Sequence, residues 1–341
     1  MKCYLAAALL LAASVAAAPA VPVFIMGRGE SSAAEFSGEA AVETVENSAV
    51  PAGYKAESYT GEPYKVLDIS TGEVLEVPER DYVIGAVCAE MPASFCEEAL
   101  KAQAVAAHTY AERQRLRERS SPDPALKGAD FSNDTEEYQG YLTLEQAKST
   151  FGDKFGENYG KISSAVDEVL PYILTYGDEP IISAFHSMSP GKTESAENAW
   201  GAPVDYLVPV DSSFDTAAPK YMDEVRFGCD ELKSLLESKF PGIVVAGEPA
   251  SWICVENVSD SGTVLAASAG DRSVTGNDLR IALGLRSACF DVRTEGKEVV
   301  FTTRGYGHGV GMSQYGANAM ATEGSTWREI LEHYYPDCVI S

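Results

Sequence analysis

Apolar and polar residues alternate over residues 64–69 and 74–77, on either side of Ser70-Thr71-Gly72. A period of two residues predicts strands, and the turn residues between them predict a hairpin. The spacing then lengthens to that of a helix, and a short helix is predicted over residues 81–90, ended by the proline of Met91-Pro92. The folded part of the chain is therefore expected to begin with this hairpin.

A long helix is predicted from Ser94, because Ser94 and Glu97 have the S-x-x-E spacing of a capping box. Its first half is rich in alanine, which leaves a narrow face on which neighbouring elements can pack closely. The alanines stand at positions 99, 102, 104, 106, 107 and 111. The charged stretch at 112–119 is predicted to be the solvated end of the helix.

Further helices and strands follow in irregular order. The predicted helices cover residues 143–151, 157–169, 230–240, 277–285 and 326–335, and the predicted strands cover 172–176, 180–186, 252–258, 290–294 and 299–303. The last two strands form a second hairpin. No internal repeat and no regular strand–helix–strand alternation is found, so the sequence predicts an α+β fold of mixed helices and short antiparallel sheets.

The N-terminus has the composition of a membrane segment. Residues 3–26 are apolar throughout, between Lys2 and Arg28, and about 20 such residues span a bilayer. A cleaved secretory signal is the alternative, but Pro19 directly follows the small residues 16–18 and disfavours cleavage there. We therefore expect an uncleaved transmembrane helix.

The chain is expected to have three parts: an anchor at residues 1–27, a spacer at 28–60 and a folded domain at 61–341. The spacer is rich in Ala, Glu, Ser and Gly without a sustained apolar period, which predicts acidic disorder. With either interpretation of the N-terminus, the folded domain lies outside the cytoplasm. The formal charge of −25 argues against DNA, RNA or anionic lipid as the partner, because those require a basic surface.

Six cysteines lie outside the predicted anchor, and their spacing does not resolve any pairing. They are Cys88, Cys96, Cys229, Cys254, Cys289 and Cys338. A loop-closing disulfide between Cys88 and Cys96 is conceivable. Cys289 and Cys338 are expected to be free, small core residues.

Glycine occupies every second position from 305 to 311. Such a run cannot be a packed strand, and it offers bare backbone that a ligand can approach, with positive φ open at each step. A helix is predicted from Gly311, so that free N–H groups point back into the loop. Polar and aromatic groups accompany the glycines: Tyr306, His308, Ser313, Gln314 and Tyr315. No Gly-Lys-Ser/Thr follows, so this is not a phosphate-binding loop.

Glu90 has an apolar setting, between Val87-Cys88-Ala89 and Met91-Pro92. Loss of hydration raises the pKa of a carboxyl, which suits a general acid near neutral pH. The alternative is a glutamate that bonds nearby helix N–H groups. The chain has no G-x-S-x-G elbow of a serine hydrolase, and no C-x-x-C or H-x-x-x-H zinc motif. The residues alone leave both roles of Glu90 open.

Four stretches resemble, in order, the signature of the stage II sporulation protein D (SpoIID) family, which includes the LytB-type amidase enhancers. They are DYVIGAVCAEMP (81–92), ALKAQAVAAHTYA (99–111), FHSMSPGKTESAENAWG (185–201) and the glycine-rich segment 304–321. The resemblance runs from about Tyr64 to the C-terminus. It implies an extracytoplasmic domain with two lobes around a substrate cleft, acting in sporulation during engulfment.

The resemblance also implies a peptidoglycan lytic transglycosylase, which cleaves MurNAc–GlcNAc bonds of denuded glycan strands to 1,6-anhydro products. Glu90 would be the acid/base, and the substrate's own C6 hydroxyl the nucleophile, so that one carboxyl suffices where ordinary glycosidases need two. The implied substrate-binding residues are Gln103, His108, His186, Ser187, Lys192, Thr193, Glu194, Tyr306, His308, Gly309, Ser313, Gln314 and Tyr315. No cofactor and no metal is expected, because residues 127–141 lack the Cys/His cluster that some relatives carry there.

The implied partners are glycan strands, an amidase of the SpoIIP type and other engulfment membrane proteins. Two alternatives remain: a hydrolytic muramidase with Glu194 or Glu197 as a second acid, and a non-catalytic wall-binding or amidase-enhancing protein. The chain departs from the family pattern at His108, where Arg is usual, and at Pro190, where Gly is usual. If His108 orients substrate, glycan binding is expected to strengthen as pH falls from about 8 to 6, because the imidazole gains charge.

Overall fold

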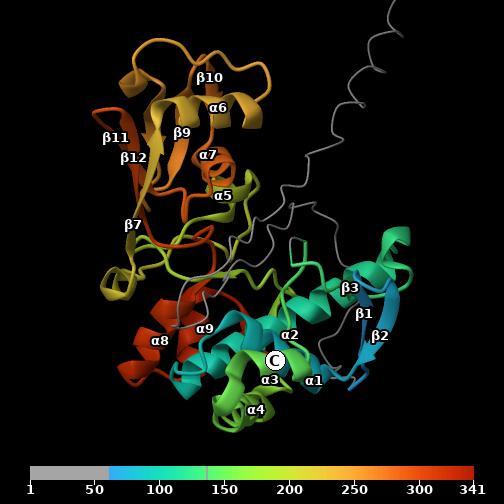
Figure 1. Ribbon diagram of the computed structural model, residues 1–341. Coiled ribbons are helices and arrows are strands. Elements are labelled where there is room, and N and C mark those ends of the chain that lie inside the picture. Colours follow the sequence, from blue (N-terminus) through green and yellow to red (C-terminus); the bar gives the residue numbers. More distant parts are fainter. Residues whose placement is uncertain (1–60, 136) are drawn as a thin grey trace, which may run out of the picture. The chain divides into compact units, whose positions relative to one another are not determined.

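The computed structural model describes residues 61–135 and 137–341 (Figure 1). The predicted anchor and spacer lie outside the described residues. Within the described part, no helix has both the length and the apolar composition needed to cross a bilayer.

Helices and strands are interspersed along the described chain. The helices are α1 (Glu79–Glu90), α2 (Glu97–Ser120), α3 (Leu144–Phe151), α4 (Phe155–Val169), α5 (Ala196–Trp200), α6 (Cys229–Lys239), α7 (Gly276–Leu283), α8 (Gln314–Thr322) and α9 (Trp327–Tyr334). Single 3-10 turns occur at Pro124–Leu126, Gly152–Lys154, Ser213–Ala217 and Pro249–Ser251.

The strands are short. They are β1 (Tyr64–Asp68), β2 (Glu73–Val77), β3 (Phe131–Ser132), β4 (Leu174–Tyr176), β5 (Glu179–Pro180), β6 (Phe185–His186), β7 (Met222–Gly228), β8 (Ile253–Val258), β9 (Val264–Ala269), β10 (Arg272–Val274), β11 (Phe290–Glu295), β12 (Glu298–Arg304), β13 (Met312–Ser313) and β14 (Val339–Ile340). In the described part they form small sheets with the orders β2-β1-β3, β10-β9-β8, β11-β12-β7, β13-β6 and β14-β4-β5.

This is the mixed α+β fold that the sequence predicts. Both predicted hairpins are present, as the antiparallel pairs β1/β2 and β11/β12. Two pairs differ from the prediction of antiparallel sheets, because β1/β3 and β13/β6 are parallel. Each joins segments that are far apart in the chain, and no local turn signal specifies such a pairing.

Helix α2 is the centre of the α-helical part and contacts α1, α4, α8 and α9. Its alanines allow this crowding, and residues 99–112 are all buried. The predicted start is wrong: α2 begins at Glu97 with Cys96 as N-cap, and no side chain caps it. The prediction of a solvated end is also wrong in part, because Glu112 and Arg115 are 4% and 1% exposed.

The apolar core has two main clusters. One combines β1, α1, α2, α4 and the C-terminal helices α8 and α9. The other is built entirely from residues 227–301, between the second-last and the last of the four motifs, and fills the space among β7–β12, α6 and α7. Figure 1 shows strands β7, β9, β10, β11 and β12 gathered beside helices α6 and α7. The C-terminal segment 310–340 returns to the first cluster.

Candidate functional site

Glu90 is the last residue of α1, and only 3% of it is exposed. The Gly140 N–H donates to its carboxylate, and a side chain at Gly140 would crowd that group, with Cβ 3.3 Å from Oε1. Among the described residues, Oε2 has no hydrogen-bond partner. Burial outweighs the Gly140 hydrogen bond and raises the pKa of Glu90 to about 8. The carboxyl therefore stays protonated at neutral pH, in the apolar setting that the sequence predicts.

Gln314 joins Glu90 to the C-terminal motif. Its Nε2 donates to the Glu90 backbone oxygen at 2.9 Å and to Gln103 Oε1 at 3.4 Å. Gln103 and Gln314 are 0% and 3% exposed, so these amides are fixed by one another. The contact brings together α1, α2 and the start of α8.

A two-residue parallel ladder brings the third motif to the same place. Met312 pairs with Phe185, and Ser313 pairs with His186. Ser313 caps α8 by accepting from the Gly316 N–H, and the Tyr315 N–H donates to the Ser187 oxygen at 3.0 Å. All four sequence motifs therefore converge around the C-terminal end of α1.

Asp215 fixes this convergence, although no motif in the sequence points to this residue. Its buried carboxylate accepts from the Ser189 N–H, and from the hydroxyls of Ser189, Ser212 and Ser313. Burial raises the pKa of Asp215, although these donors oppose the shift. Four donors saturate the carboxylate, so Asp215 holds two motif segments together and is not available as a base.

The glycine run packs on the protein's own backbone. Gly305, Gly307, Gly309 and Gly311 all have positive φ, as predicted. A Cβ at Gly311 would lie 2.0 Å from the Ala184 oxygen, and one at Gly307 would lie 2.8 Å from His186 Cβ. The expectation that this backbone is open to a ligand is therefore wrong at these two positions: the glycines are needed for close approach to the segment at β6.

His186, His308 and Trp200 form an aromatic group beside that loop. The His308 ring centroid lies 5.7 Å from His186 and 5.5 Å from Trp200. His186 Nδ1 is 3.1 Å from the Val310 oxygen, which can only accept, so Nδ1 carries the proton and Nε2 is bare. Burial lowers the pKa of His186 to about 4 and that of His308 well below its usual value, so both rings are neutral. His186 Nε2 and Trp200 Nε1 have no partner among the described residues.

The other predicted binding residues have structural contacts of their own. Thr193 bonds the backbone of Val208 and Val210. Glu194 accepts from Ser195 N–H, Asn198 Nδ2 and the Ser259 hydroxyl, so both its oxygens are engaged.

The remaining predicted binding residues are more accessible. Lys192, Tyr306, His308 and Tyr315 are half-buried. Tyr306 lies under the Arg286 guanidinium, and Tyr315 packs edge-on against Phe95.

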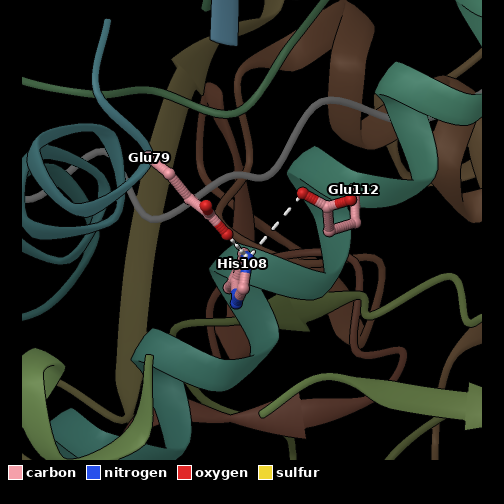
Figure 2. Close-up of side chains that lie close together, drawn as sticks. All are labelled: Glu79, His108 and Glu112. Atoms are coloured by element: carbon pink, nitrogen blue, oxygen red, sulfur yellow. Dashed lines mark ion pairs between the residues drawn. The ribbon is translucent and has the colours of Figure 1, made fainter. Parts of the chain in front are cut away.

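His108 is not part of this group. It is 2% exposed, and its Nε2 lies 2.6 Å from Glu79 Oε1 (Figure 2). Glu79 is the first residue of α1 and Glu90 the last, which places them roughly 16 Å apart at 1.5 Å per residue. The predicted contact between His108 and substrate beside Glu90 is therefore not supported, since no exposed surface of the ring is available.

The cysteines near Glu90 are not cross-linked in the described part of the chain. All six described cysteines are free thiols, including Cys88 and Cys96 on either side of Glu90. Cys88 is buried in the core, and Cys96 Sγ contacts the Thr322 hydroxyl at 3.3 Å. The conceived disulfide between Cys88 and Cys96 is absent from the described residues.

Comparison with known proteins gives a consistent result. A family model described as SpoIID, stage II sporulation protein, matches residues 68–176. The chain is 38% identical over 293 residues to stage II sporulation protein D of Bacillus subtilis, covering 85% of this chain and 83% of that one. The homologue of Bacillus amyloliquefaciens is 38% identical over 276 residues, covering 81% and 78%. The amidase enhancer of Bacillus subtilis is 26% identical over 308 residues, covering 75% of this chain and 40% of that one.

Proposed function

The chain belongs to the stage II sporulation protein D family, a family of sporulation proteins, and we propose that it is a peptidoglycan lytic transglycosylase with Glu90 as its single acid/base. The substrate is the bond between N-acetylmuramic acid and N-acetylglucosamine in glycan strands whose stem peptides have been removed. The product carries a 1,6-anhydro ring.

One observation carries this proposal. Glu90 is a buried carboxyl with a pKa of about 8, and one of its oxygens has no partner among the described residues. A protonated carboxyl at neutral pH can donate to the leaving oxygen. Glu194 and Asp215, the other buried carboxylates that the motifs bring together, are engaged by three or more donors each.

The reaction needs one carboxyl. Glu90 donates its proton to the glycosidic oxygen as the bond from C1 to that oxygen breaks. The carboxylate then takes the proton of the muramic C6 hydroxyl, whose oxygen bonds to C1. Glu90 ends protonated, as it began, and no water is consumed.

The hydrolytic alternative needs a second acid, and its two candidates among the described residues, Glu194 and Glu197, are poorly suited to that role. Ordinary glycosidases require a second carboxylate that binds water or attacks C1. Glu194 is fully bonded, and Glu197 is exposed on α5. The alternative of a non-catalytic wall-binding or amidase-enhancing protein is supported by the similarity to the amidase enhancer of Bacillus subtilis, which covers 75% of this chain.

The setting follows from the same proposal. The folded domain acts outside the cytoplasm, attached by the apolar N-terminal segment, on strands that an amidase of the SpoIIP type has denuded. Other engulfment membrane proteins would accompany it.

Mass spectrometry of digested, stem-peptide-free glycan tests the proposal. Wild type should release fragments with 1,6-anhydro ends, and the Glu90→Gln protein should release at least ~10²-fold less, the usual scale of general acid catalysis. Glu197→Gln, a matched change at an exposed glutamate of α5, should cleave normally. Reducing ends would instead indicate a muramidase, and intact glycan with wild type would indicate a binding or enhancing protein.

A further inference from the structure

Buried charges gather where the first turn of α1 meets the middle of α2. We name Glu79, His108, Glu112 and Arg115 the charge cluster; each is at most 4% exposed. His108 Nε2 lies 2.6 Å from Glu79 Oε1 and 3.8 Å from Glu112 Oε1, as Figure 2 shows. Glu112 Oε1 also accepts from the Arg115 guanidinium and from the Tyr64 hydroxyl of β1. Helices α1 and α2 and strand β1 are therefore joined by one buried network of polar side chains.

The orientation of the His108 ring determines what its Nε2 must be. Nδ1 faces the Tyr172 backbone oxygen at 3.3 Å, and a carbonyl can only accept, so Nδ1 carries a proton. In a neutral ring Nε2 would then be a bare lone pair. That lone pair would lie 2.6 Å from a carboxylate oxygen, which is repulsive. The contact has the distance of an ion pair without the alignment of a hydrogen bond.

The charge count leads to the same result. Glu79 and Glu112 carry two negative charges, and Arg115 carries one positive charge. Burial opposes the charge on Arg115, but Glu112, Tyr64 and Glu79 outweigh it and raise its pKa. Burial, reinforced by Glu112, raises the pKa of Tyr64 well above its usual range, so its hydroxyl stays neutral. With both glutamates ionised, one further positive charge is needed to balance the cluster.

A metal ion is a poor source of that charge. These residue types do bind zinc, but tetrahedral zinc with bonds of about 2.0–2.2 Å places neighbouring ligand atoms roughly 3.3 Å apart. The Glu79–His108 separation of 2.6 Å is too short for such a bridge. Glu112 Oε1 is already occupied by Tyr64 and Arg115, and the guanidinium repels a dication.

We propose that His108 is held as an imidazolium ion and that the charge cluster is a proton-dependent clamp between α1 and α2. His108 is thus a positioning residue, because it fixes the first turn of the helix whose last residue is Glu90. The clamp does not depend on whether Glu90 cleaves glycan.

The clamp makes stability depend on pH in one direction. The native state keeps a proton that the unfolded chain releases near pH 6.5, where ordinary histidine titrates. Wherever the native state binds more protons, stability falls as pH rises. The loss continues until the native protein also releases the proton, leaving an uncompensated buried carboxylate.

Thermal unfolding of the purified full-length protein tests the clamp. All proteins carry Glu90→Gln, which removes the titration of that carboxyl. Adding Glu79→Gln supplies a neutral amide donor to the Nε2 lone pair, so His108 no longer needs a second proton. Between pH 6.5 and 9 the parent Tm should fall by roughly 5–10 °C more than that of the Glu79→Gln variant, the scale expected for a broken buried pair. Glu97→Gln, at an exposed glutamate of α2 that pairs with Lys101, should follow the parent.

Histidine-ring ¹⁵N spectra of the wild-type protein provide a second readout, which does not depend on the Glu79→Gln variant. At pH 7.5 His108, assigned by a His108→Gln variant, should show two protonated ring nitrogens, and neutral His186 should show one. A neutral pattern for His108, or parallel Tm curves with and without Glu79→Gln, would overturn the proposal. One zinc per chain that is lost in the His108→Gln protein would replace the clamp with a metal site. If Glu79→Gln does not fold, the ring spectrum still decides.

Discussion

Replacing Glu90 with glutamine should produce two stability curves that cross as pH rises. In wild type the native carboxyl has a pKa of about 8, whereas an unfolded glutamate titrates near 4.5. The native state therefore binds a proton that the unfolded state has lost, and wild-type stability falls as pH rises from 4.5 to 8. Glutamine does not titrate, so this part of the pH dependence disappears.

The magnitude follows from the size of the pKa difference. At about 1.4 kcal/mol per pH unit, the rise from 4.5 to about 8 corresponds to roughly 5 kcal/mol, which approaches the whole stability of many domains. Glutamine has its own cost. Its Oε1 can still accept from Gly140, but its amide places two N–H donors where the protonated carboxyl has one O–H, at a position that has no partner among the described residues. An unsatisfied buried donor costs about 1–3 kcal/mol.

The variant should therefore be less stable than wild type at pH 5 by up to about 2 kcal/mol, and more stable at pH 9 by about 2–4 kcal/mol. Urea unfolding at pH 5, 7 and 9 measures this difference, with Glu197→Gln as a matched change at an exposed glutamate. The other titrating groups contribute equally to the free energy of unfolding of both proteins, so their contributions cancel in the difference. Parallel curves would mean that native Glu90 is ionised at neutral pH, and its role as a proton donor would then be refuted.

Three further predictions concern the framework of the site. Gly311→Ala should unfold the protein or lower its Tm far more than Gly296→Ala. Both glycines have positive φ, but only at Gly311 would the added Cβ meet backbone, the Ala184 oxygen at 2.0 Å. Equal effects would contradict the close packing of the glycine run. Asp215→Ala leaves four donors without their acceptor and should cost more than about 3 kcal/mol in urea unfolding; a near-neutral effect would show that water replaces the carboxylate. Strong chelators should leave glycan cleavage unchanged and metal analysis should find no stoichiometric zinc, whereas one zinc per chain would contradict the metal-free mechanism.

Local patterns were sufficient for most of the secondary structure. The hairpins β1/β2 and β11/β12 follow from two-residue alternation around a turn, and α9 follows from a helical period with a capping box at Thr326. The raised pKa of Glu90 was predictable too, because its apolar neighbours in the chain are also its neighbours in space. These signals depend on residues a few positions apart.

The errors in prediction arose where distant segments meet. Ser94 and Glu97 have the spacing of a cap, yet α2 starts after Cys96, whose N–H is bonded by Asn318 from α8. The charged residues after position 111 resemble a solvated helix end, but Tyr64 of β1 covers two of them: it is bonded to Glu112 across 48 positions, and the Arg115 guanidinium lies over its ring.

The amino-acid sequence by itself determined the fold class, the family and the carboxyl most suited to acid catalysis. Only the tertiary structure decided which polar residues are free to act. Asp215 and Glu194 are saturated, Glu90 keeps one oxygen without a partner among the described residues, and His108 belongs to a buried charge cluster. The physical reason is that burial and hydrogen-bond satisfaction depend on segments 48 to 224 residues apart, and no local period encodes which of them will meet.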